Sequence, residues 1–206
     1  MRSERSDSRD RIRIAELAAR LLREGSAADV AQARHKAAAH MGIRDEALLP
    51  SRTEIEAALR QQQALFGGGH AQDLQRKREA ALHALEFLHA FEPRLAGAVL
   101  DGTAVAHTAV SVHLHVDEPE AIERFLHDQR IGANLGTRHL HLQRGGPRVP
   151  LPCWTFDADG IPFELLVLPR SALQQPPVQA MDGQRLPRAS LAQLRRHLAT
   201  DSWPQD

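Results

Sequence analysis

The sequence predicts an α+β fold, in which a helical N-terminal region precedes a mixed β-sheet packed with helices. The main reason is that apolar residues recur at helical spacing up to Pro93 and then alternate with polar residues in the period of a strand. A second observation is the run Gly67-Gly68-Gly69, which interrupts the helical pattern. We therefore expect a helical region at residues 1–69 and an α/β domain at residues 70–206.

Four helices are expected before Pro93. The first ends at Gly25 and has one apolar stripe, formed by Ile14, Leu17, Ala18, Leu21 and Leu22. Ser26 is expected to cap the second, over about 27–41. The capping box Ser51-Arg52-Thr53-Glu54 opens the third, which runs to about residue 66. The fourth covers about 71–91, because Pro93 prevents further helix.

Strands are expected after Pro93. Val110, Val112, Leu114 and Val116 alternate with Ser111, His113 and His115, which predicts a strand with one buried face. A short strand at 95–100 precedes it and an amphipathic helix at 118–128 follows it. Three more strands and a last helix complete the order, at residues 138–143, 149–157, 161–168 and 190–198.

The composition is that of an ordinary globular protein, and it narrows the function classes. Basic and acidic side chains are equal in number, 26 each, so no global attraction to nucleic acid or to an anionic membrane is expected. The one cysteine, Cys153, excludes an intrachain disulfide framework. No apolar run has transmembrane length, and the polar N-terminus lacks the apolar segment of a secretory signal. We expect a cytoplasmic protein with no membrane partner.

Residues 97–117 combine a small pair, a glycine-containing turn and a strand with polar residues at alternate positions, in GAVLDGTAVAHTAVSVHLHVD. This outline resembles the motif of the polymerase-β-like nucleotidyltransferase superfamily, in which Gly-Ser is followed, after a spacer, by Asp-x-Asp or Asp-x-Glu. More narrowly, the run from Pro50 to the C-terminus is similar to bacterial nucleotidyltransferase-like proteins. The resemblance implies a nucleotidyltransferase-like sheet, with Ala109 and Ser111 at the two acidic places.

The resemblance also implies a site for a nucleoside triphosphate around this turn. Its residues would be Gly97, Ala98, Gly102, Thr103 and His107. Active members of the family hold two divalent cations with three carboxylates, and these cations clamp the triphosphate for in-line attack. Here Glu164 is the candidate for the third carboxylate, Ala109 has no ligand atom, and Ser111 is a poor Mg²⁺ ligand. One carboxylate cannot position two cations, so the motif is degenerate.

These departures leave several functions open. The first hypothesis is a catalytically degenerate protein that binds a nucleoside triphosphate or a partner protein. The second is a weakly active nucleotidyltransferase, in which Glu164 with Ser111 or a nearby histidine holds one metal ion and these are the residual catalytic residues. A purely structural interpretation stands beside both, in which the glycines only form a tight exit from a strand.

Twelve histidines are the second unusual feature of the sequence. His113 and His115 form one H-x-H pair and His139 and His141 another, and each pair lies on one face of its strand. If the strands are neighbours and Leu140 and Leu142 take the buried side, the four imidazoles would converge near Glu164. Imidazole suits Zn²⁺, Ni²⁺ or Cu²⁺ better than Mg²⁺, so such a site would make this a histidine-based transition-metal-binding protein, which is a further alternative function. The cofactor stays open, and the candidates are Mg²⁺, for a residual carboxylate site, and a transition metal such as Zn²⁺. The alternative is a solvated polar face.

Three weaker signals have ordinary interpretations. Arg34 to His40 matches the loose R-x(4–6)-H pattern of HEPN-type ribonucleases, but the solvated face of an alanine-rich helix explains it. The cluster Arg76-Lys77-Arg78 could meet phosphate, although a solvated charge run is the default, and a nucleic-acid partner is not favoured. Cys153 has no signature of a nucleophile, and its neighbours Trp154 and Phe156 are expected in the core.

Overall fold

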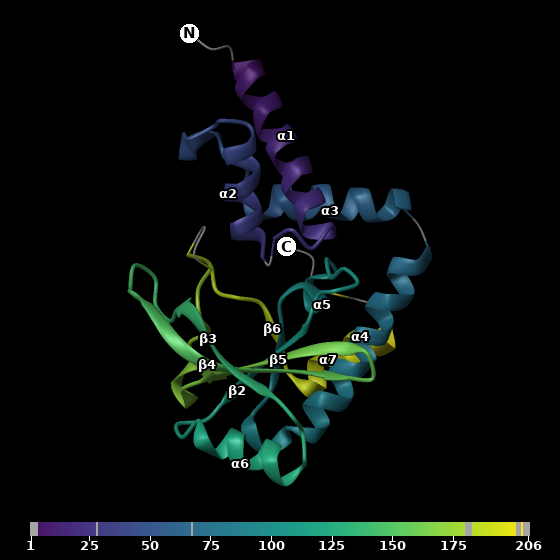
Figure 1. Ribbon diagram of the computed structural model, residues 1–206, viewed down its shortest axis with the longest axis vertical. Coiled ribbons are helices and arrows are strands. Elements are labelled where there is room, and N and C mark those ends of the chain that lie inside the picture. The colour runs from purple at the N-terminus through teal and green to yellow at the C-terminus, as the bar shows by residue number, and fades with distance from the viewer. Residues whose placement is uncertain (1–3, 28, 67, 180–182, 201–202, 204–206) are drawn as a thin grey trace. The chain divides into compact units, whose positions relative to one another are not determined.

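The computed structural model describes the chain except for residues 1–3, 28, 67, 180–182, 201–202 and 204–206 (Figure 1). Contacts divide the chain into two compact units, Met1–Ala71 and Gln72–Gln205, which are described separately below. The division lies inside helix α4 (Gly68–Phe87), just beyond the glycine run at which the sequence predicts a boundary.

The first unit is helical, as its apolar spacing predicts. It contains α1 (Glu4–Arg23), α2 (Val30–His40), the 3₁₀ turn η1 (Glu46–Leu48) and α3 (Arg52–Phe66). Its core joins Ile14 and Ala18 of α1 to Ala37 of α2 and Ile55 of α3. The capping box is confirmed, because Glu54 Oε2 accepts from the Ser51 amide across 2.6 Å and Ser51 Oγ accepts from the Glu54 amide. The cap expected at Ser26 is wrong, since Asp29 caps α2.

The second unit contains most of α4 and a sheet of six strands among the described residues. The strands are β1 (Arg94–Ala96), β2 (Val110–His115), β3 (Asn134–His141), β4 (Arg148–Ala158), β5 (Ile161–Leu168) and β6 (Arg188–Ala189). The other elements are η2 (His89–Phe91), α5 (Ala98–Asp101), α6 (Glu120–Asp128), η3 (Arg170–Leu173) and α7 (Leu191–Thr200). The expected α+β class and mixed sheet are thus confirmed.

The strand order is β3-β4-β5-β2-β1-β6, with β2 and β5 parallel and every other neighbouring pair antiparallel. The strand expected at 95–100 is wrong beyond Ala96. Gly97 has φ 71° and ψ −160°, a conformation that only glycine adopts readily, and it turns the chain into α5. β1 and β2 therefore lie side by side with the turn of the motif between them.

The two faces of the sheet differ in what covers them. On one face Val112 of β2 and Leu165 of β5 pack against α4, α6 and α7 through Leu85, Ile122 and Leu194. We call this the helix-covered face. The opposite face, here called the polar face, carries Arg94, Ser111, His113, His115, Arg138, Cys153, Thr155, Glu164 and Arg188, as strand alternation and pairing require.

Candidate functional site on the polar face

Two basic side chains of α4 hold the connection between β1 and β2. Lys77 is 5% exposed and its Nζ donates to the carbonyl oxygens of Val105, Ala106 and Thr108, across 2.6, 2.8 and 2.6 Å. Arg78 is also buried, donates to the Val99 carbonyl and lies with its guanidinium 3.3 Å from the centre of the Trp203 ring. The solvated charge run expected at residues 76–78 is therefore wrong at Lys77 and Arg78.

These contacts fix the loop that contains the expected nucleotide-binding residues. Gly97, Ala98 and Gly102 are half-buried, Thr103 is buried, and His107 is exposed on the loop before β2. A Cβ on Gly97 would lie 3.8 Å from the Ser111 Cβ, so the glycine turn passes directly over Ser111. The structure thus brings the Gly97 end of the motif next to the second of the two expected acidic positions.

Glu164 lies beside Ser111, because these residues are partners in the parallel pairing of β2 and β5. The carboxylate is held by Arg138 of β3, whose Nε and Nη2 donate to the same oxygen, Oε2, across 3.0 and 2.7 Å. The Glu164 side chain is 15% exposed and that of Arg138 is 45% exposed. The carboxylate that could bind a cation is therefore already paired with a guanidinium.

Cys153 lies next to this ion pair on the neighbouring strand β4. Burial, and then the negative charge of Glu164, raise the pKa of the Cys153 thiol to about 12. The thiol is therefore protonated at neutral pH. This agrees with the absence of a nucleophile signature in its sequence surroundings.

His113 and His115 lie on the same face as Ser111, as alternation predicts, but they are buried there, at 4% and 0% exposure, so the expectation of only one buried face for this strand is wrong. His115 Nδ1 donates to the Glu92 carbonyl across 2.7 Å, and Nε2 accepts from Arg188 Nη1 across 2.8 Å. Burial, together with the charges of Arg188 and Arg94 and against the opposing effect of the Glu92 hydrogen bond, lowers the pKa of His115 to about 4. Burial, with the charge of Arg188, lowers the pKa of His113 to about 3. Both rings are neutral at pH 7.

The second histidine pair lies on the other face of the sheet, so the expected convergence of four imidazoles is wrong. His139 pairs with Pro150, on the helix-covered side of β4, whereas Arg138 and Leu140 share the side of His113. The reason is that Leu140 and Leu142 pack against a second, smaller cluster of Leu151, Cys153, Leu166, Leu168 and Ala172 on the polar face. In the described part of the chain, no group of three or more His, Cys, Asp or Glu residues could hold a metal ion.

The polar face is rich in arginine. Arg94, Arg138 and Arg188 come from β1, β3 and β6, and the acidic residues at described strand positions of this face are Glu164 and Asp157. Asp157 is at the hairpin end of β4, where its carboxylate accepts from the Gly160 amide. Even with both histidines neutral, the three arginines outnumber the two carboxylates, so this face has more positive than negative charge.

The three arginines were not candidate residues in the sequence. Arg138 and Leu140 are two residues apart on the expected strand, so the sequence places them on the same face. The pairing of Arg138 with Glu164, however, depends on the order of the strands in the sheet. Arg188 ends the stretch 169–188, whose several prolines predict an extended loop, so nothing in the sequence indicates that it joins the sheet.

Comparison of the chain with family models, with curated proteins and with solved structures finds no match. Among the described residues, no helix combines the length and the apolar character that crossing a membrane requires.

Proposed function

We propose that the second unit is a nucleotidyltransferase-like domain that binds a nucleoside triphosphate without transferring it. The observation that carries this proposal is the pairing of Glu164 with Arg138 beside Ser111. At the place where active relatives hold metal ions with several carboxylates, this chain has one carboxylate, and a guanidinium holds it.

The frame of the motif supports the nucleotidyltransferase interpretation. β1, the turn at Gly97, α5 and β2 follow one another as the family outline requires, and β5 places Glu164 on the strand next to Ser111. Gly97 has a conformation that its missing side chain permits, and its backbone lies over Ser111. These features support a motif that keeps the family's order of strands and turn but has lost two of its metal-binding carboxylates.

The charge of the polar face supports direct binding of phosphate. A triphosphate is strongly anionic, and active relatives offset this charge with Mg²⁺. In this chain Arg94 and Arg188 carry positive charge near the neutral His113 and His115. Guanidinium groups recognise phosphate oxygens without a metal ion. We therefore expect binding that does not require Mg²⁺.

The alternative is a weakly active nucleotidyltransferase. It is favoured by the position of Glu164, which lies beside the Ser111 hydroxyl and could hold one cation if Arg138 moved away. A single cation would provide only part of the charge stabilisation that in-line transfer needs. This alternative predicts Mg²⁺-dependent labelling of a protein or RNA acceptor by a labelled nucleotide, and loss of labelling in Glu164→Ala.

Thermal unfolding in the presence of ATP, CTP, GTP or UTP tests the proposal, each with Mg²⁺ and with EDTA. We expect at least one nucleotide to raise the unfolding midpoint at millimolar concentration in EDTA, because a ligand that binds only the folded state stabilises it. Arg94→Gln should reduce this effect, whereas Arg196→Gln, at an exposed position of α7, should not. A midpoint that no nucleotide changes would contradict nucleotide binding and leave the hypothesis of a partner protein.

A further inference from the structure

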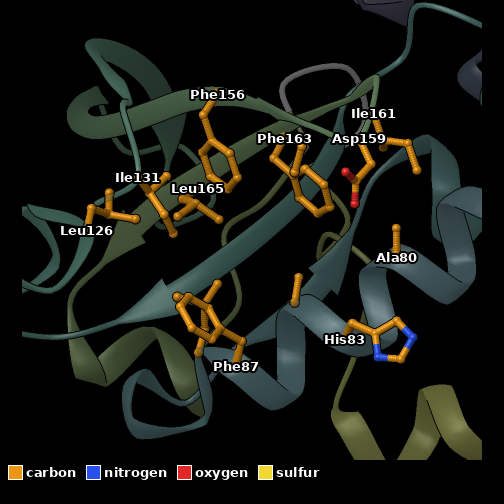
Figure 2. A pocket seen from close by; sticks show the side chains of 13 residues that line it. Ala80, His83, Phe87, Leu126, Ile131, Phe156, Asp159, Ile161, Phe163 and Leu165 are labelled. Carbon is orange, nitrogen blue, oxygen red and sulfur yellow. The ribbon is translucent and has the colours of Figure 1, made fainter. Parts of the chain in front are cut away.

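A pocket opens on the helix-covered face of the second unit, away from the polar face. It lies between α4, the end of α6 with the following loop, and the β4–β5 hairpin, and its volume is about 310 Å³ (Figure 2). This is near the lower end of the range of roughly 300–1,000 Å³ that is usual for small-molecule sites. The strand residues that line it are on the face of the sheet opposite Glu164, so this pocket is independent of the proposed nucleotide site.

The pocket exists because α4 has small side chains where it faces the β4–β5 hairpin. Ala80 and Ala84, one turn apart, face the sheet, while Leu85 of the same helix is large and fills the core beside them; Leu88, just beyond the end of α4, also lines the pocket. Phe163 and Leu165 form the opposite wall. A larger residue at position 84 would occupy the space that the two alanines leave.

Aromatic rings form much of the wall. Phe156 and Phe163, partners across β4 and β5, are stacked with ring centroids 5.3 Å apart and an interplanar angle of 6°. Phe87 of α4 lies across the pocket from them (Figure 2) and contacts Phe125, yet it remains 45% exposed. A flat apolar ligand in the pocket would cover this exposed phenylalanine ring and remove its apolar surface from water.

The polar groups of the pocket are at one side of its opening. His83 and Asp159 lie on the same side of it (Figure 2). Asp159 is exposed at the tip of the hairpin, and within the described residues its carboxylate has no hydrogen-bond or ion-pair partner; the Gly160 amide of this turn donates to Asp157 instead. The nearby Glu86 is paired with Arg195, so Asp159 provides the unneutralised charge at the opening.

We propose that this pocket binds a small arylalkylamine, with its aromatic ring between Phe87 and the stacked pair Phe156 and Phe163 and its ammonium group beside Asp159. The volume selects a molecule of one or two rings. The apolar wall provides most of the affinity, and Asp159 selects a cation over a neutral or anionic analogue. A carboxylate at a solvent-exposed opening contributes little, so selectivity of about threefold for the amine over the alcohol is expected.

Titration of the full chain with phenethylamine, phenethyl alcohol and 3-phenylpropionate tests this, followed by calorimetry and by ligand-observed NMR. The amine should bind most tightly and 3-phenylpropionate most weakly. Asp159→Asn should remove the preference for the amine and leave the alcohol unchanged, whereas Glu118→Gln, at an exposed site outside the pocket lining, should change neither. Equal binding of all three probes by the parent chain would overturn the role of Asp159.

Two further variants test the location. Ala84→Leu fills the pocket and should abolish binding of all three probes, while Ala71→Leu, at an exposed position of the same helix, should not. Phe87→Ser removes an exposed wall without touching the core, so it keeps the test decisive if Ala84→Leu does not fold. Absence of saturable binding at millimolar concentration, or unchanged binding in both pocket variants, would overturn the proposal. So would a dimer of the parent chain that Ala84→Leu converts to a monomer, since the pocket would then be an interface.

Discussion

Arg188 donates a hydrogen bond from Nη1 to Nε2 of His115 across 2.8 Å, and thereby joins the short edge strand β6 to the middle of the sheet. The other ring nitrogen of His115 donates to the Glu92 carbonyl, so both nitrogens are used only when the imidazole is neutral. A proton on Nε2 would remove the acceptor and bring two cations together. The same arrangement that completes the polar face therefore makes it sensitive to acid.

Stability is expected to fall as the pH falls from about 6.5 to about 4. The pKa values of His113 and His115 are lowered to about 3 and about 4 in the folded chain, whereas the unfolded chain takes up these protons near the ordinary value of about 6.5. Between these values the unfolded state binds more protons, so acid favours unfolding, by about 1.4 kcal/mol per pH unit for each histidine. Urea unfolding at several pH values measures this slope.

His113→Leu should flatten that pH dependence and leave stability at pH 7 unchanged or slightly higher. In the described residues the buried Nδ1 of His113 has no hydrogen-bond partner, so the substitution removes an unsatisfied polar atom. The control is His127→Gln, since His127 is on the surface with its side chain 90% exposed. An unchanged slope in His113→Leu would assign the acid sensitivity to other groups.

Lys77→Met should destabilise the chain by roughly 2–4 kcal/mol, because three carbonyl oxygens of the β1–β2 connection lose a charged donor. Arg76→Met, at the exposed neighbouring position, should cost little. Chemical denaturation gives the difference, and hydrogen exchange should show that protection is lost first around residues 103–108. Equal costs for both substitutions would mean that the three hydrogen bonds do not stabilise the loop.

Much of the fold could be predicted from the sequence, since local pattern decides it. The helices of the first unit follow from their apolar stripes, and β2 follows from the alternation of Val110, Val112 and Leu114 with polar residues. The alternation also placed Ser111, His113 and His115 correctly on one face. It could not show that this face is covered at His113 and His115, because a period of two identifies two faces without saying which is exposed.

The site could be predicted only in part, since it depends on the order of the strands and on the smaller apolar cluster that covers part of the polar face. Glu164 was a candidate from the sequence, and its place beside Ser111 follows from the parallel pairing of β2 and β5. Arg138 was missed because its partner is on another strand. The error at His139 and His141 arose from treating Leu140 as part of the main core, whereas it packs against the smaller cluster on the polar face.

Gly97→Ala should cost about 1–3 kcal/mol, because φ 71° with ψ −160° is a backbone conformation that a residue with a Cβ rarely adopts. The space itself would admit a methyl group, since the nearest atom outside the adjacent residues is Ser111 Cβ at 3.8 Å. Gly132→Ala is the matched control, as nothing surrounds that position and its φ is not positive. Thermal unfolding of both variants separates the backbone effect from a general effect of replacing glycine, and similar midpoints would exclude strain at Gly97.

Restoring two carboxylates should create a cation site if the frame is that of a nucleotidyltransferase. In the double variant Ala109→Asp, Ser111→Asp, the new side chain at 111 would lie beside Glu164, and the one at 109 would precede it on the same side of the chain. Three carboxylates provide the hard oxygen ligands that Mg²⁺ and Mn²⁺ prefer. We expect millimolar Mn²⁺ to raise the unfolding midpoint of this variant and not that of the parent chain. Adding Arg138→Met should strengthen the effect, because Glu164 is then released from its guanidinium.

The corresponding amide variant, Ala109→Asn, Ser111→Asn, is the control for this experiment, because it has the same shape without the charge. It should show no response to Mn²⁺. A response of the acidic variant that Glu164→Gln leaves intact would place the cation elsewhere. No response in either acidic variant would mean that residues 109, 111 and 164 do not form the metal frame of the family, and the glycine turn would then be only a tight exit from β1.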